Sequence, residues 1–198
     1  MQTLRVHSIS HNSVTNGPGT RSILHVQGCG LGCLGCVNKS TWPTSGGYLL
    51  TVDEVVARLT SKSNSEGITI SGGEPLDQWV AVKAVVQRVL RKRPAHTVVL
   101  FSGYTPEEIL EQPAHSPRFE NRWEELSATV DTAVLGRFDA TKLVPLGQRR
   151  NLISSTNQVV QHFSQEVMEI SDLPEAEIDI DAQGRLVYRG VAGHSILL

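Results

Sequence analysis

The chain has 198 residues, a hydrophobic content of 39% and a formal net charge of −2 at pH 7. This length suits one domain with a full core, and the near-balanced charge argues against a dedicated nucleic-acid binder, which would be strongly basic. No apolar run approaches the ~20 residues that span a bilayer, and the N-terminus lacks the pattern of a secretion signal. We therefore expect a cytoplasmic protein with no membrane or nucleic-acid partner.

The N-terminal part of the chain is predicted to form a strand, a loop and a second strand. Residues 3–9 alternate loosely between apolar and polar side chains, which predicts a short strand. Residues 11–21 contain Asn-Gly and Pro-Gly dipeptides, which are turn signals, so these residues are expected to form a loop. Residues 22–27 predict another strand, which would deliver the chain into the segment that holds the cysteines.

Cys29, Cys33 and Cys36 are the only cysteines of the chain, and their spacing is C-x3-C-x2-C. Three thiolates this close would converge on one point. A structural zinc site needs four ligands, usually as two pairs, and a disulfide framework needs an even number of cysteines. A cubane iron–sulfur cluster normally takes four cysteines, so three would leave one iron open to an outside ligand. We favour such a cluster over zinc and over inert core cysteines.

A second candidate site lies at the end of the next predicted strand. Residues 67–71 have the pattern of a short buried strand, and the strand runs directly into Gly72, Gly73 and Glu74. Glycines leave room for a ligand beside the strand edge because they have no Cβ. A glutamate there could accept a hydrogen bond from a cationic amine. The alternative interpretation is a plain strand-to-helix turn.

Helices and strands alternate over the rest of the core. Capping-box patterns at residues 51–54 and 105–108 each predict the start of a helix, and the longest helix is expected over residues 77–93. Such alternation is typical of an α/β domain with a largely parallel sheet. Five or six strands are too few to close an eight-stranded barrel, which predicts an open, partial barrel. The later strands are expected at residues 97–101, 129–135 and 157–163.

The C-terminal residues differ from this core. Residues 177–181 and 185–189 alternate with period two around a short Ala-Gln-Gly segment, which predicts a β-hairpin. We therefore expect a core domain over residues 1–163 and an extension over residues 164–198 that contains the hairpin and packs on the core.

The cysteine spacing resembles the signature of the radical S-adenosylmethionine (SAM) enzymes, and the Gly-Gly-Glu motif one βα unit downstream strengthens the likeness. The resemblance implies an open (β/α)6-type barrel, a [4Fe-4S] cluster held by Cys29, Cys33 and Cys36, and SAM as the second cofactor. The amino and carboxylate groups of SAM would bind the open iron. An electron from the reduced cluster would then cleave the sulfonium and yield a 5′-deoxyadenosyl radical.

Four further segments resemble one branch of that superfamily, the glycyl-radical-enzyme activases. Residues 16–21 are similar to the N-terminal motif of these activases, and residues 36–42, 101–104 and 154–160 to segments of the activating proteins of anaerobic (class III) ribonucleotide reductase. The resemblance implies that the radical takes a hydrogen atom from a glycine Cα of a partner enzyme, and that a flavodoxin-like or other low-potential donor supplies the electron. The residues expected to contact SAM are Gly35, Asn38, Gly72, Gly73, Glu74, Ser102 and Arg137.

One position departs from the family pattern. An acidic residue usually precedes the glycine of a Gly-Lys/Arg-Phe motif, but here Leu135 precedes Gly136, which leaves open whether a monovalent cation binds there. The departure also leaves open a stand-alone radical SAM enzyme that modifies a small molecule or peptide. An electron carrier or a zinc module would need neither an open iron nor the Gly-Gly-Glu motif. Hydrogen-atom transfer requires no side-chain base, so no histidine is assigned a role.

Overall fold

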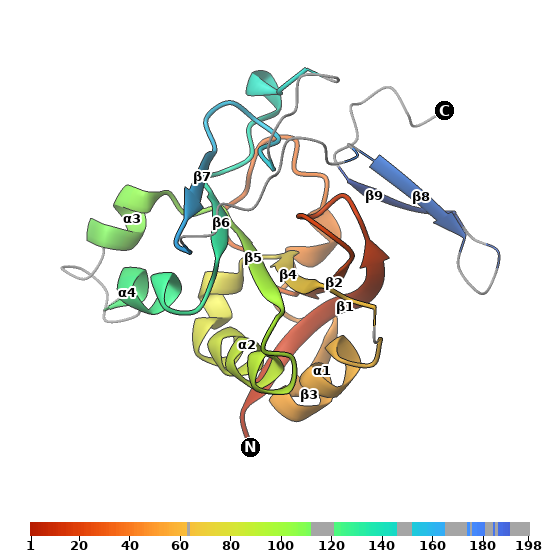
Figure 1. Cartoon of the computed structure of the whole chain (residues 1–198). Helices are drawn as coiled ribbons and strands as arrows, with labels where there is room; N and C mark the ends of the chain where they lie inside the picture. The colour runs from red at the N-terminus through yellow and green to blue at the C-terminus, as the bar shows by residue number, and fades with distance from the viewer. Residues whose placement is uncertain are drawn as a thin grey trace.

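The structure is a computed structural model that describes residues 1–62, 64–111, 121–145 and 152–164, together with residues 174, 176–180, 184 and 186–190. A seven-stranded mixed sheet lies at its centre, in the order β3-β1-β2-β4-β5-β6-β7 (Figure 1). The strands of this sheet are β1 (Thr3–Ser13), β2 (Arg21–Val26), β3 (Tyr48–Thr51), β4 (Gly67–Gly72), β5 (Thr97–Ser102), β6 (Thr132–Leu135) and β7 (Val159–His162).

The middle of this sheet is parallel and both of its edges are antiparallel. β2, β4, β5 and β6 run parallel to one another, whereas β1, β3 and β7 each pair antiparallel with their neighbours. Within the described residues the sheet does not close, which confirms the open α/β architecture. The described part of the sheet has four parallel strands, whereas a (β/α)6 arrangement would have six. The antiparallel strands at its edges need no crossover helix.

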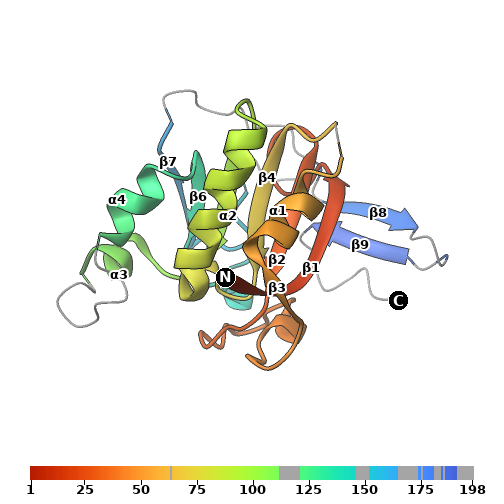
Figure 2. The same cartoon turned by 90° about the horizontal axis from the view of Figure 1, so that it is seen from below.

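Two helices, α1 (Val52–Leu59) and α2 (Trp79–Lys92), cover one face of the sheet, as Figure 2 shows. Their apolar residues recur at helical spacing and are buried against the strands. α3 (Pro106–Glu111) and α4 (Arg122–Ser127) lie together on the β7 side of the sheet. Short 3₁₀ helices are found at η1 (Lys39–Thr41), η2 (Pro75–Gln78) and η5 (Ala140–Lys142).

Both predicted capping boxes are confirmed. The N–H of Thr51 donates to Glu54 Oε2 at 2.7 Å, and the N–H of Glu54 donates to Thr51 Oγ1 at 3.2 Å. At α3 the N–H of Thr105 donates to Glu108 Oε2 at 2.9 Å, and the N–H of Glu108 donates to Thr105 Oγ1 at 3.2 Å. Each pair satisfies backbone donors that the first turn of a helix leaves without a partner.

The N-terminal strands differ from the expectation. β1 continues to Ser13, into residues predicted to form a loop, and it pairs with β2 through two register shifts. β3, which no sequence pattern predicted, pairs with residues 3–6 of β1. Both features depend on pairing with segments distant in sequence, and four residues beside two glycines carry too little periodicity to indicate a strand.

The two faces of the sheet pack against different parts of the chain. On β5, Val98 and Leu100 point into the large core beneath the helices, whereas Val99 points to the opposite face, as the alternation of a strand requires. On that opposite face Val99 packs in a small apolar cluster with Val134 and Leu152. Among the described residues, no α-helical residue belongs to this cluster, and Leu152 and Phe101 of the cluster also line the cavity described below.

A separate two-stranded antiparallel sheet is formed by β8 (Ala176–Ile180) and β9 (Leu186–Gly190). It contacts the loop that follows β1, where the backbone N–H of Val14 donates to Glu177 Oε2 at 2.9 Å. Within the described residues, no helix has the length and apolar character needed to cross a membrane.

Candidate functional site

The carboxyl ends of the four parallel strands lie at one edge of the sheet, and each leads into predicted site residues. The cysteine loop (residues 29–36) follows β2, and residues 72–74, 102–104 and 136–138 lie at the ends of β4, β5 and β6. A cavity of about 190 Å³ lies among them. The predicted site residues that line this cavity are Cys29, Cys33, Cys36, Asn38, Gly72, Gly73, Glu74 and Ser102.

Backbone hydrogen bonds hold the start of the cysteine loop. The N–H of Gly28 donates to the carbonyl of Thr41 at 2.7 Å, and the N–H of Cys29 donates to the carbonyl of Trp42 at 3.1 Å. Burial raises the pKa of the Cys29 thiol to about 11, and burial also raises the pKa of the Cys33 thiol. These thiols are therefore protonated near neutral pH until a cation binds them.

Three sulfur atoms in the wall of one cavity suit an iron–sulfur cluster. Thiolates are soft ligands that select iron–sulfur clusters or zinc over hard cations such as magnesium, and metal binding releases the thiol protons. Among the residues that the structure describes, no three Cys, His, Asp or Glu side chains are already arranged around one metal position. The shared cavity and the chemistry of the donors, rather than a preformed ligand geometry, match the expected cluster.

The Gly-Gly-Glu motif packs against the start of the cysteine loop. The N–H of Gly73 donates to Val26 O at 2.8 Å, and the N–H of Glu74 donates to Gly28 O at 2.8 Å. A Cβ on Gly73 would lie 2.3 Å from the carbonyl oxygen of Gly28. A Cβ on Gly72, whose φ is +105°, would lie 2.7 Å from backbone atoms of Val26. These glycines therefore make room for the neighbouring backbone as well as for the cavity.

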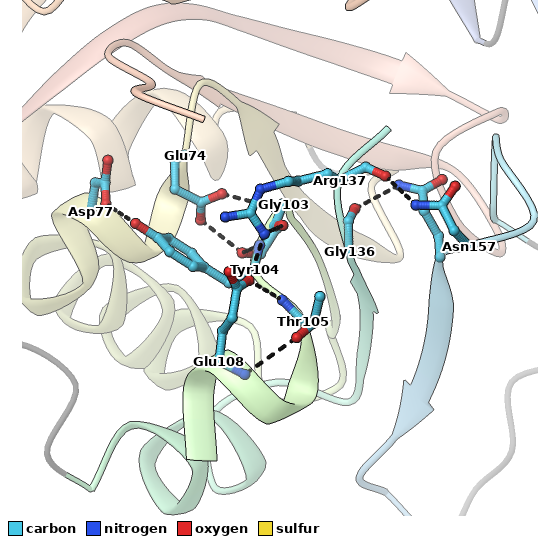
Figure 3. A network of polar contacts seen from close by, with 11 residues as sticks. Glu74, Asp77, Gly103, Tyr104, Thr105, Glu108, Gly136, Arg137 and Asn157 are labelled. Carbon is cyan, nitrogen blue, oxygen red and sulfur yellow. Dashed lines mark hydrogen bonds and ion pairs between the residues drawn. The ribbon is translucent and has the colours of Figure 1, made fainter. Parts of the chain in front are cut away.

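Glu74 is buried, with 1% of its surface exposed, and its carboxylate is surrounded by donors. Oε1 accepts from the N–H of Leu76 and from Ser102 Oγ, each at 2.8 Å. Oε2 accepts from the N–H of Gly103 at 2.8 Å (Figure 3). A carboxylate offers about four acceptor positions, so three are already filled from within the chain. Glu74 thus ties the end of β4 to the end of β5 and keeps about one position for a ligand.

Burial raises the pKa of Glu74 from 4.5 to about 7, against the opposing effect of its hydrogen bonds. Between these pH values the folded protein binds more protons at Glu74 than the unfolded chain, so the free energy of unfolding falls as pH rises through this window. We expect the wild-type protein without its cluster to lose roughly 3 kcal/mol more than Glu74→Gln between pH 4.5 and pH 7.5. Denaturant titrations at several pH values measure this difference, and parallel profiles would contradict it.

Arg137, predicted to contact SAM, lies outside the cavity wall. Its Nη1 donates to Glu108 Oε2 at 2.6 Å, and its guanidinium lies 5.9 Å from the centre of the Tyr104 ring (Figure 3). The hydrogen bond with Glu108 is the main cause that raises the pKa of Arg137. Leu135 is fully buried in the core beneath the helices, so its side chain offers nothing to the cavity.

Gly35 also lies outside the cavity wall, with φ at +75°, and a Cβ there would come within 2.5 Å of Ala140 Cβ. The position therefore needs glycine for packing against η5. Several residues of the cavity wall are not among the predicted site residues, although some of them belong to the four segments with family likeness, residues 16–21, 36–42, 101–104 and 154–160. The unpredicted lining residues are Thr15, Asn16, Leu31, Val37, Trp42, Ser71, Phe101, Gly103, Phe138, Leu152, Ser154 and Gln158.

A larger hollow, about 630 Å³, lies against β1, β3 and α1. His7, His11 and Arg58 are in its wall, but it contains no cysteine. The hollow is therefore separate from the predicted chemistry, which depends on the loops at the carboxyl ends of the parallel strands.

Comparison with known proteins identifies the family. The profile of the 4Fe-4S single cluster domain matches residues 15–161. The anaerobic ribonucleoside-triphosphate reductase-activating protein of Vibrio cholerae is 32% identical over 81% of this chain and 99% of its own length. The protein of that name from Enterobacteria phage T4 is 32% identical over 74% of this chain and 92% of its own length.

An activating enzyme of another name matches a shorter part of the chain. The pyruvate formate-lyase-activating enzyme of Clostridium pasteurianum is 35% identical over 50% of this chain and 44% of its own length. The crystal structure of QueE from Escherichia coli aligns with 52% of this chain at a TM-score of 0.40 and 12% identity, which is too weak a likeness to support a shared function. The chain belongs to the family of the anaerobic ribonucleoside-triphosphate reductase-activating proteins, in the glycyl-radical activase branch of the radical SAM enzymes, whose cofactors are a [4Fe-4S] cluster and SAM.

Proposed function

We propose that this protein is an activase that generates a glycyl radical on an anaerobic ribonucleotide reductase. The observation that carries the proposal is that the three cysteines and the Gly-Gly-Glu motif line one cavity at the carboxyl edge of an open sheet. When bound and reduced, the cluster supplies the electron that cleaves SAM to methionine and a 5′-deoxyadenosyl radical, which takes a hydrogen atom from the glycine. Relatives that span 81% and 74% of the chain carry the name of such an activating protein.

In this function the residues of the chain bind and orient the two cofactors and exclude water from them. Cys29, Cys33 and Cys36 would hold the cluster. The residues proposed to surround SAM from the cavity wall are Asn38, Gly72, Gly73, Glu74 and Ser102. Gly35 and Arg137 lie outside the cavity wall and would act indirectly. Gly35 would allow the cysteine loop to pack on Ala140, and the positive charge of Arg137 would favour the thiolate of Cys33.

The open sheet leaves a side through which a loop of a large partner could enter. We propose that the partner inserts its glycine-bearing segment there, that a flavodoxin-like or other low-potential donor supplies the electron, and that the protein works in the cytoplasm. Residues 164–198, with β8 and β9, would form an extension to a core of residues 1–163.

The function is tested by mixing the anaerobically reconstituted, reduced protein with SAM and a candidate reductase. We expect 5′-deoxyadenosine by chromatography and a doublet glycyl signal by electron paramagnetic resonance. Absence of 5′-deoxyadenosine under reducing conditions would refute radical SAM activity altogether. A control without the reductase gives the rate of uncoupled SAM cleavage.

A stand-alone radical SAM enzyme that modifies a small molecule or peptide is the second candidate. It is favoured by Leu135, which departs from the acidic residue that the family pattern leads us to expect before Gly136 and is buried in the core instead of facing the cavity. SAM cleavage without a glycyl signal on any candidate reductase would support this alternative. A glycyl signal that depends on the cluster would exclude it as the main activity.

A further inference from the structure

A buried cation lies beneath the loop that joins β1 to β2. Arg21, the first residue of β2, has no exposed surface. Its Nε donates to Thr69 Oγ1 at 2.7 Å, its Nη1 to Pro18 O at 2.9 Å and Thr97 Oγ1 at 3.0 Å, and its Nη2 to Ile68 O at 2.6 Å and Thr97 O at 2.9 Å. All five donors of the guanidinium are thus used, and each acceptor is an uncharged oxygen.

The same residues fix the β1–β2 loop (residues 14–20). Thr69 Oγ1, which accepts from Arg21, donates in turn to the carbonyl of Asn16 at 2.7 Å. The carbonyl of Pro18 accepts directly from Arg21. A Cβ on Gly17 would lie 2.8 Å from Arg21 Cδ, so the loop rests on the arginine side chain without space between them. Direct and relayed hydrogen bonds from one guanidinium therefore hold the carbonyls of Asn16 and Pro18, whereas Glu66 holds the end of the loop at Thr20.

This loop forms part of the cavity wall. Thr15 and Asn16 line the cavity together with the cysteines, and Val14 at the start of the loop is 37% exposed. The loop therefore runs from the protein surface to the cavity. Arg21 itself lies at the amino end of β2, whereas the cysteine loop follows the other end, which is five residues or roughly 17 Å away along the strand. A substitution at Arg21 would therefore shift the part of the cavity wall formed by the loop and leave the cysteine loop in place.

Burial of the Arg21 charge carries a desolvation cost in free energy. Only good hydrogen-bond geometry offsets this cost. No carboxylate of the described residues forms an ion pair with Arg21, although the charges of Asp131 and Glu66 favour its charged form from a greater distance. Burial lowers the pKa of Arg21 to about 10, so the side chain remains charged at neutral pH. A lysine has a single ammonium group and would not match five acceptors spread over a planar fork.

We propose that Arg21 is a positioning residue that holds residues 15–18 as the wall against which the partner's glycine-bearing segment is placed. The proposal rests on the activase function. It predicts that Arg21 affects how well SAM cleavage is coupled to glycyl radical formation, and leaves cluster binding and SAM affinity unchanged.

Two variants test the proposal in the cluster-loaded protein. Arg21→Lys keeps the charge and removes the fork, whereas Thr69→Val removes the hydroxyl between Arg21 and Asn16 with little change of shape. Val89→Ala, a buried position of α2 on the other face of the sheet, is the matched destabilising control. We expect both test variants to keep their iron content and SAM Kd, while glycyl radical formed per 5′-deoxyadenosine falls about tenfold. The control should lower Tm and leave this ratio unchanged.

Hydrogen exchange of the loaded protein gives a second readout that needs no partner. Amides of residues 14–20 should exchange faster in both test variants, and those of the cysteine loop should not. Unchanged exchange and an unchanged ratio would overturn the proposal, as would an equal loss in Val89→Ala. If the wild-type protein forms no glycyl radical, the activase function fails, and the exchange measurement still decides whether Arg21 holds the loop.

Discussion

Replacement of Cys33 by alanine is expected to abolish cluster binding and all SAM cleavage. Cys33 is the middle member of the three cysteines, and each of them lines the same cavity. With one thiolate removed, two protein ligands would remain for a cluster that already has one iron without a cysteine. The loss is measured as iron and sulfide content after anaerobic reconstitution, followed by 5′-deoxyadenosine formation with a chemical reductant.

Leu34→Ala is the matched control for Cys33→Ala. Leu34 lies next to Cys33 in the same loop and is 67% exposed, so truncation removes little buried surface. We expect this variant to bind a full cluster and to cleave SAM at close to the wild-type rate. Turnover that survives in Cys33→Ala, or an iron content equal to that of the control, would refute the assignment of this ligand.

Replacement of Gly73 by alanine is expected to reduce activity about 100-fold, because a misplaced backbone moves the reacting groups apart. The added Cβ would lie 2.3 Å from the carbonyl oxygen of Gly28 and 2.9 Å from its carbonyl carbon. These are backbone atoms that cannot rotate aside, and Gly28 directly precedes Cys29. Overpacking of this kind typically costs about 1–3 kcal/mol of stability, and relief of the clash would displace the cysteine loop from the Gly-Gly-Glu motif.

The same substitution at Gly30 provides the control. A Cβ on Gly30 would meet no atom within 4 Å, although the residue lies in the cysteine loop beside Cys29. We expect Gly30→Ala to retain SAM affinity and cleavage rate, as measured by equilibrium binding and chromatography of 5′-deoxyadenosine. Equal losses in the two variants would show that any alanine in these loops is harmful and that the contact with Gly28 is not the cause.

The features that the sequence predicted well are those encoded by neighbouring residues. The capping boxes at Thr51 and Thr105 depend on a partner three residues away, and both are present. The central strands have apolar patterns of their own. The antiparallel edges, by contrast, depend on pairing between distant segments, which explains why β3 and the extension of β1 were missed.

In the site, too, the features encoded by neighbouring residues were predicted, and those that depend on distant residues were not. The cysteine spacing is local, and the three residues do line one cavity. The donors to Glu74 come from residues 76, 102 and 103, so no local pattern indicates that its carboxylate is already occupied. The turn signals of residues 11–21 place Arg21 in a loop, where an arginine is usually exposed, but its burial depends on Thr69 and Thr97 on two other strands.

Glu108 has two roles that engineering of this protein would have to treat together. Glu108 Oε2 accepts from the N–H of Thr105, directly before α3, and also from Arg137, whose positive charge lowers the pKa of Cys33. A substitution chosen only to improve the start of the helix would also release the arginine. Substitutions of Glu108 selected for higher thermal stability would therefore also change the electrostatic environment of the cysteine ligands.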